Sequence, residues 1–163
     1  MKLYCEHRIA RDAQKLWAVL HTPAFETRLA RAIGLDEYSE LEREETRDAV
    51  YRKIRVVPHI PSAFRSLLQR VGAAERVSYI EEQWQSREAM EVRWRMTPSL
   101  LADRTRIEGR IRIDPLDATS CLRVLDGTVN VRLPGLGRAV ERAIVSGALE
   151  AYEKSAQEAS RRP

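Results

Sequence analysis

The stretch PGLGRAVERAIVSGALEAYEKSAQEAS, residues 134–160, decides how the rest of the chain folds. Within this stretch no proline follows Pro134, and the preceding hundred residues instead alternate between apolar and polar positions, as antiparallel strands do. A long terminal helix after such a sheet is expected to cover it. Small and apolar residues recur about every 3.6 residues along one face of this helix, namely Leu136, Val140, Ala143, Ile144, Gly147, Ala148 and Ala151.

This expected inner face is mostly alanine and glycine, which fill little space. Opposite it, the strand pattern places large apolar residues. A face of small side chains cannot reach normal core density against such residues, so the pattern predicts an internal cavity between the helix and the sheet. The residues expected to line this cavity are Val92, Trp94, Ile107, Ile111, Ile144 and Gly147.

The other elements follow from alternation and from capping residues. One strand is expected at residues 2–9, followed by helices at 12–20 and 22–34 that begin at Asp12 and at Thr22-Pro23. Six further strands are expected at 35–43, 46–57, 76–85, 88–96, 104–114 and 122–133. Their hairpin-length connections favour an antiparallel sheet, so the fold class is α+β.

In the strand before the terminal helix, the apolar residues shift from even to odd positions. Leu122 and Val124 occupy even positions, whereas Val129 and Val131 occupy odd positions. A β-bulge at residues 126–127 would return all of them to one apolar face, and we expect one there.

Charge and composition narrow the class of protein. The 163 residues carry a net charge of +4, yet no basic run exceeds two residues, so no nucleic-acid partner is expected. The alternating arginines of residues 104–114 are interpreted as a solvated, ion-paired outer face.

The length fits a single domain over residues 1–163. With no apolar run of membrane-spanning length and no signal-peptide pattern, we expect a cytoplasmic protein. Cys5 and Cys121 lie far apart, and the three histidines are scattered, so no metal or other cofactor is expected.

The order of elements resembles the START-like superfamily (SRPBCC, the Bet v 1-type helix-grip fold), which includes plant allergens, lipid-transfer domains and aromatic polyketide cyclases. Residues 57–62, 82–84 and 127–137 with Glu141 resemble an uncharacterised bacterial family of this superfamily, and the similarity to PRELI-type lipid carriers is weaker. The resemblance implies a seven-stranded curved antiparallel sheet wrapped around a long C-terminal helix, with a cavity for a hydrophobic ligand. The matching motifs contain no catalytic residue.

Two polar positions are candidates for contact with a ligand. His7 shares the apolar face of the first strand and is interpreted as a hydrogen-bonded core residue, with a ligand or general-base role as the alternative. Tyr79, Glu81 and Gln83 are predicted to face inward if the chain turns tightly at 86–87. A register slip of one residue would turn Ile80, Glu82 and Trp84 inward instead.

Further apolar candidates lie in one strand and in one helical segment. Met90, with Trp94, is interpreted as core or as part of an adaptable pocket wall. Residues 58–71 interrupt the strands with an amphipathic helix, whose Phe64, Leu67 and Leu68 are expected to gate the cavity and to allow transient membrane contact.

The sequence therefore favours binding or transport of a hydrophobic small molecule or lipid, without catalysis. The first alternative is a polyketide cyclase/dehydratase-type enzyme in which His7 or Glu81 moves protons. The second is a protein-interaction module. Val145, Leu149 and Tyr152 form a stripe that either mediates contact, giving a weak homodimer, or is buried in a monomer.

Overall fold

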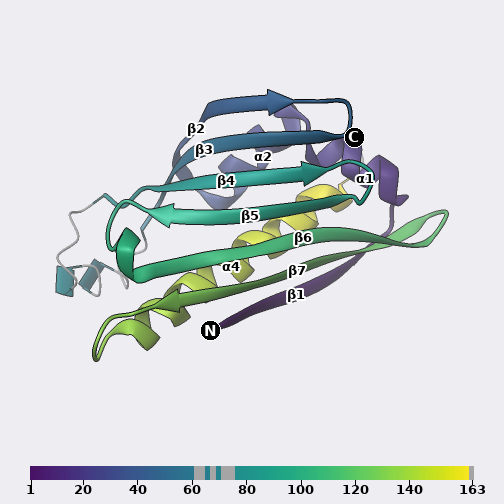
Figure 1. Ribbon diagram of the computed structural model, residues 1–163. Helices are drawn as coiled ribbons and strands as arrows, with labels where there is room; N and C mark the ends of the chain where they lie inside the picture. Colours follow the sequence, from purple (N-terminus) through teal and green to yellow (C-terminus); the bar gives the residue numbers. More distant parts are fainter. Residues whose placement is uncertain (61–64, 67–68, 71–75, 162–163) are drawn as a thin grey trace.

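The computed structural model describes residues 1–60, 65–66, 69–70 and 76–161. Seven antiparallel strands form one curved sheet in the order β1-β7-β6-β5-β4-β3-β2, with the helices on its concave side (Figure 1). The predicted α+β helix-grip fold is confirmed. The strands are β1 (Lys2–Ile9), β2 (Leu35–Glu45), β3 (Ala49–Pro58), β4 (Tyr79–Ser86), β5 (Glu91–Pro98), β6 (Thr105–Asp117) and β7 (Ser120–Val131). The helices are α1 (Ala13–Leu20), α2 (Pro23–Ile33) and α4 (Gly137–Ser160), with a short 3-10 turn η1 (Ala102–Arg104).

The two short helices begin and end as their capping residues predict. The Asp12 carboxylate accepts a hydrogen bond from the backbone N–H of Lys15 at 3.0 Å, and the Thr22 hydroxyl accepts one from Phe25 at 3.2 Å. Gly34 ends α2 in the left-handed conformation, with φ of 71°. These caps fix the sharp corner through which the chain leaves β1 and enters β2.

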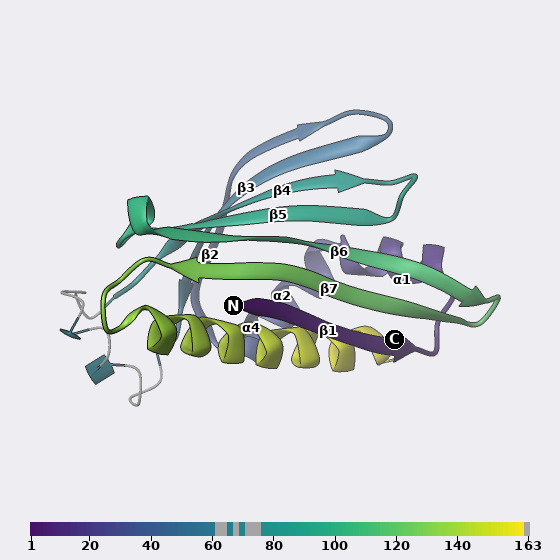
Figure 2. The ribbon, with the colours of Figure 1, turned by 60° about the horizontal axis from the view of Figure 1, so that its bottom comes forward.

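Helix α4 lies under one side of the sheet, against β1 and β7, and also packs against α2 (Figure 2). Tyr152 is buried, and Val145 and Leu149 are half-buried against the sheet, so this stripe is interior. The inner face is therefore rotated by roughly one residue step, about 100°, from the predicted one. None of the helices in the described ranges is long and apolar enough to cross a membrane.

The rotation follows from the size of the side chains. The larger residues of α4 take the positions against the strands, where they remove the most apolar surface from water. Gly147, which was expected to face the sheet, is exposed instead, and a Cβ placed there would meet no atom within 4 Å.

A tryptophan packed on two glycines shapes the centre of the sheet. Gly109 on β6 and Gly127 on β7 lie directly opposite each other, and the indole of Trp94 on β5 covers both. A Cβ at Gly109 would lie 2.7 Å from the indole and would overlap the carbonyl oxygen of Asp126. The close approach of ring and backbone is possible only because both positions lack a side chain.

The predicted bulge in the last strand is wrong. β6 and β7 pair in one continuous register from Ile107 opposite Val129 to Ile113 opposite Arg123. Val124 therefore points outward, where it is buried on the outer face between its cross-strand neighbours Glu6 and Arg112. The consequence is that Arg123 points into the molecule.

The outer face carries the expected ion pairs. Glu91 lies 3.9 Å from Arg110, and Glu108 lies 3.7 Å from Arg95. These arginines extend into solvent and are neutralised by carboxylates of the same or neighbouring strands.

The glycine pair provides a test of this packing. Replacing Gly109 by Ala should lower the free energy of unfolding by roughly 1–3 kcal/mol or more, because the new methyl group would overlap backbone. Replacing Gly147 by Ala should raise the free energy by up to about 1 kcal/mol, because alanine favours helix and the site is open. Urea denaturation of both variants measures the difference. Equal stability of the two variants would contradict the described packing.

Candidate functional site

The concave face of the sheet has two chemically different halves. The half formed by β1, β7, β6 and β5 is mostly apolar and packs on α4 through a cluster around Trp94, Ile107 and Tyr152, with His7 and Arg123 as inward polar exceptions. The half formed by β4 and β3 turns polar side chains inward and makes no comparably extensive contact with α4. Its inward-facing polar residues are Tyr79, Glu81, Gln83 and Gln85 on β4 and Arg52 on β3.

The inward direction of the β4 residues agrees with the prediction, although their partners differ. The turn after β4 spans four residues, 87–90, and not two, so Gln83 pairs with Trp94 and Glu81 with Met96. A change of register by an even number of residues preserves the face. The alternative register is wrong, because Trp84 is 40% exposed on the outer side.

Three side chains form a hydrogen-bonded row along β4. The amide nitrogen of Gln85 donates to the side-chain oxygen of Gln83 at 3.1 Å, and the amide nitrogen of Gln83 donates to Glu81 at 2.6 Å. Part of the Glu81 side chain is still exposed to solvent. The surrounding protein nevertheless desolvates its carboxyl group, which raises the pKa of Glu81. This combination is typical of a group on the wall of a concavity.

Arg52 is an inward-facing charge on the polar half that the sequence analysis missed. Its guanidinium donates to Glu26 of α2 and to Glu40 of β2, and it lies 3.4 Å from the hydroxyl of Tyr38. Only 4% of Arg52 is exposed. The sequence did indicate its direction, because Arg52 stands at an even position, on the same strand face as Val50, Ile54 and Val56. Its two carboxylate partners make it a structural bridge between α2 and the sheet.

Arg123 is a second inward-facing arginine that was missed, and its surroundings are different. One guanidinium nitrogen donates to the hydroxyl of Ser155 on α4 at 2.8 Å, and the group lies 4.3 Å from the ring centre of Tyr152. Within the described residues, no carboxylate pairs with it, and its Nε has no hydrogen-bond partner. Leu122 and Val124 were expected to face inward, so the alternation pattern placed Arg123, which lies between them, on the outer face.

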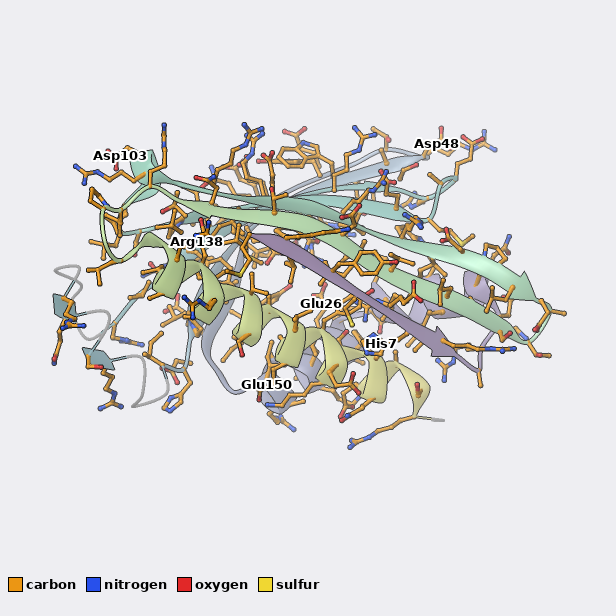
Figure 3. The ribbon with its side chains drawn as sticks, turned by 90° about the horizontal axis from the view of Figure 1, so that it is seen from below. His7, Glu26, Asp48, Asp103, Arg138 and Glu150 are labelled. Atoms are coloured by element: carbon orange, nitrogen blue, oxygen red, sulfur yellow. The ribbon has the colours of Figure 1, made fainter. Side chains whose placement is uncertain are left out.

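His7 lies at the edge of the sheet beside α4 and away from the polar half (Figure 3). Its Nε2 lies 2.5 Å from a carboxylate oxygen of Glu153, and the sulfur of Cys5 lies 3.7 Å from the same nitrogen. Burial raises the pKa of the Cys5 thiol, and the charge of Glu153 adds to that effect. The thiol is thus kept protonated, which is the opposite of what a nucleophilic cysteine needs.

The two expected proton-transfer residues are far apart in the sheet. His7 is on β1 and Glu81 is on β4, with β7, β6 and β5 between them. At about 4.8 Å per strand, the separation is roughly 15–20 Å. His7 and Glu81 therefore cannot act on one bond of a small molecule.

The apolar candidates fall into two groups. Trp94 and Ile107 are buried, and Ile111 and Ile144 are half-buried, in one cluster with α4. Val92 is buried opposite Ile111 on the neighbouring strand. The indole nitrogen of Trp94 is buried without a partner.

Two expected lining residues lie elsewhere. Gly147 is exposed on α4. Met90 belongs to the turn after β4, with φ of 46°, and packs on a separate cluster near α1. The expected gate cannot be placed, because Phe64, Leu67 and Leu68 lie outside the described residues.

Two hollows stand out in the described part of the chain. One, of about 810 Å³, is bordered by residues such as Lys2, Arg106 and Asp126 on the outer side of the sheet, and the other, of about 90 Å³, lies beside Pro58. Neither lies between α4 and the inner face. The described residues also contain no cluster of three or more His, Cys, Asp or Glu suited to a metal ion.

Solved structures with the same fold cover nearly the whole chain. The Zhui aromatase/cyclase from Streptomyces sp. R1128 has a TM-score of 0.72 at 16% identity, over 99% of this chain and 94% of that one. Truncated norcoclaurine synthase from Thalictrum flavum gives 0.69 at 15%, over 100% and 95%. A START superfamily protein from Mycobacterium smegmatis gives 0.59 at 17%, over 94% and 92%. At these identities the likeness shows the fold.

The sequence itself matches one family model. No curated protein matches it. The model described as "Protein of unknown function (DUF2505)" matches residues 5–162, which is nearly the full length. Together with the seven-stranded sheet closed by α4, this match shows that the chain belongs to the DUF2505 family and has the START-like helix-grip fold.

Proposed function

We propose that this protein binds one hydrophobic small molecule or lipid in the concavity between α4 and the polar half of the sheet, and carries it without changing it. The observation that supports this proposal is the wall formed by β4 and β5. Glu81, Gln83 and Met96 point inward from it and stay only half-buried, although neighbouring protein desolvates the carboxyl. Partial exposure beside a desolvated carboxyl supports a wall that protein surrounds without packing tightly against it.

The wall is also suited to an amphipathic guest. Met96 and Ile111 offer an apolar, adaptable surface, whereas Tyr79, Glu81 and Gln83 offer hydrogen-bonding groups beside it. Ligand sites commonly combine a mostly apolar lining with a few oriented polar groups. A structure of norcoclaurine synthase, which shares the fold, contains dopamine and hydroxybenzaldehyde. This supports a small, partly aromatic molecule as one kind of guest.

Binding is preferred over catalysis because the acid–base candidates are dispersed. His7 contacts Glu153 at the edge of the sheet, and Glu81 accepts a hydrogen bond from the amide of Gln83 and lies within electrostatic reach of Arg52 and Glu26, which already pair with each other. An acid–base enzyme needs its groups within hydrogen-bond reach of one substrate position. Glu81 alone, with its raised pKa, is the group around which an enzymatic function would be built.

The proposal predicts that filling the concavity blocks uptake. In Met96→Trp, the larger ring should occupy the space beside Glu81 and weaken binding of the neutral fluorescent probe N-phenyl-1-naphthylamine by about tenfold, or about 1.4 kcal/mol. Thr97→Trp is the matched control, because the next residue of β5 is exposed and points to the other face. Fluorescence titration of both variants and the wild type measures the effect.

Two results would count against the proposed function. One is a wild-type protein that takes up no probe and carries no additional mass in native mass spectrometry. The other is equal probe binding by Met96→Trp and Thr97→Trp while both remain folded.

The raised pKa of Glu81 predicts a dependence of stability on pH. The folded-state pKa lies above the unfolded one, so the favourable contribution is complete below the unfolded pKa and is lost as pH rises through the folded pKa. Glu81→Gln should therefore be more stable than the wild type near pH 8, and the difference should shrink towards pH 4. Glu82→Gln, on the outer face, is the control. Guanidinium denaturation at several pH values measures both, and a constant difference across this range would contradict the assignment.

A further inference from the structure

Arg123 has no counter-ion in the described structure. It extends from β7 beneath the sheet, is 6% exposed, and has His7 of β1 and Ile113 of β6 as cross-strand neighbours. Ser155 is its hydrogen-bond partner, and the Tyr152 ring lies against the guanidinium. A neutral hydroxyl and an aromatic ring stabilise a buried charge far less than a carboxylate does.

The carboxylates that the helices bring to this end of the molecule have cations of their own. Glu26 pairs with Arg52, Glu153 contacts His7, and Glu158 pairs with Arg28 and Arg161. Arg52, which is equally buried, shows what a structural arginine has in this fold, namely two carboxylates. Arg123 departs from that pattern.

The buried charge is a stability problem for the protein alone. Moving an ion out of water costs several kcal/mol unless a partner of opposite charge compensates. Burial lowers the pKa of Arg123, yet an arginine guanidinium stays protonated in proteins. Burial also lowers the pKa of His21 at the end of α1, and the charges of Arg52 and Arg123 add to this lowering.

Within the described residues, three buried hydrogen-bond donors have no partner: Nε of Arg123, the hydroxyl of the adjoining Tyr152 and the indole N–H of Trp94, which belongs to the same apolar cluster as Tyr152. One buried carboxylate oxygen of Glu158 also has no hydrogen bond, but Glu158 forms ion pairs with Arg28 and Arg161. Burial raises the pKa of Tyr152 to about 12, so its hydroxyl keeps the proton. Unused donors of this kind require an acceptor. Trp94 and Tyr152 belong to the same apolar cluster under α4, so an acceptor among them would lie beside an apolar surface.

On the basis of the proposed function, we propose that Arg123 anchors the carboxylate of an amphipathic ligand, a lipophilic carboxylic acid whose apolar body extends along Trp94 and Ile111 towards the β4 wall. A planar carboxylate matches the guanidinium fork, and its single charge neutralises the single buried cation. A phosphate monoester carries about −1.5 to −2 charges at neutral pH and would leave negative charge buried in turn.

The test compares an acid with its ester. The probes are cis-parinaric acid, a fluorescent C18 carboxylic acid, and its methyl ester, titrated into the purified full chain. The wild type should bind the acid at least about tenfold more tightly than the ester. Arg123→Met should weaken acid binding by about thirtyfold or more, as expected for loss of a buried charge partner, and should leave ester binding within about threefold. Arg110→Met, on the outer face, should leave both affinities unchanged.

Stability of the ligand-free variants separates a binding role from a structural one. Arg123→Met removes an uncompensated charge and keeps the aliphatic bulk, so its midpoint of denaturation should equal or exceed that of the wild type. An arginine needed for the fold would instead lower it. If Arg123→Met does not fold, the inference is overturned, and Arg123→Lys, which keeps the charge without the fork, then shows whether the charge itself is what the fold requires.

The outcomes distinguish this inference from the function on which it rests. Wild-type protein that binds N-phenyl-1-naphthylamine and the ester but shows no preference for the acid, or keeps that preference in Arg123→Met, refutes the anchor and leaves the carrier function standing. Wild-type protein that binds none of the three probes refutes both. A carboxylic acid released from the purified protein and absent from Arg123→Met supports both.

Discussion

One helix cannot cover seven strands, and the rest of the structure depends on this mismatch. Six inter-strand spacings of about 4.8 Å make the sheet roughly 29 Å wide, whereas a helix with its side chains is about 10–12 Å across. α4 therefore covers β1 and β7 and their neighbours, and α2 covers part of the opposite edge. Between them, the inward side chains of β4 at Tyr79, Glu81 and Gln83 stay only half-buried within the described residues.

The sequence was sufficient for the faces of most strands and insufficient for their registers. Alternation identifies which side chains share a face, so Glu81 and Gln83 could be placed inward even though the turn after β4 was assigned two residues and has four. Alternation failed at β7 because Val124 is an apolar residue buried on the outer face, under long neighbouring side chains. Its burial made the even positions look like the inner ones, so Arg123 was assigned to the wrong face. The face of α4 was misjudged because small residues were taken as the inner ones.

The two buried arginines show how the same side chain can serve different ends within one fold. Arg52 has Glu26 and Glu40 as partners and so joins α2, β2 and β3 into one unit. Arg123 has a hydroxyl and an aromatic ring. The comparison within a single molecule is informative because burial is nearly equal for the two, at 4% and 6% exposed. What differs is only the charge opposite each guanidinium.

The position of β1 has a consequence for how the chain folds. Among the described strands, β1 has β7 as its one neighbour. The Met1 amino group donates to the carbonyl of Val129, 128 residues away, and lies 3.6 Å from Glu141. β1 thus has no partner in this sheet until β7, the last of its strands in chain order, has been synthesised. Closing so long a loop is entropically expensive and slows folding. β2 to β7, by contrast, can assemble as successive neighbours, so the sheet is completed from its far edge and β1 joins it late.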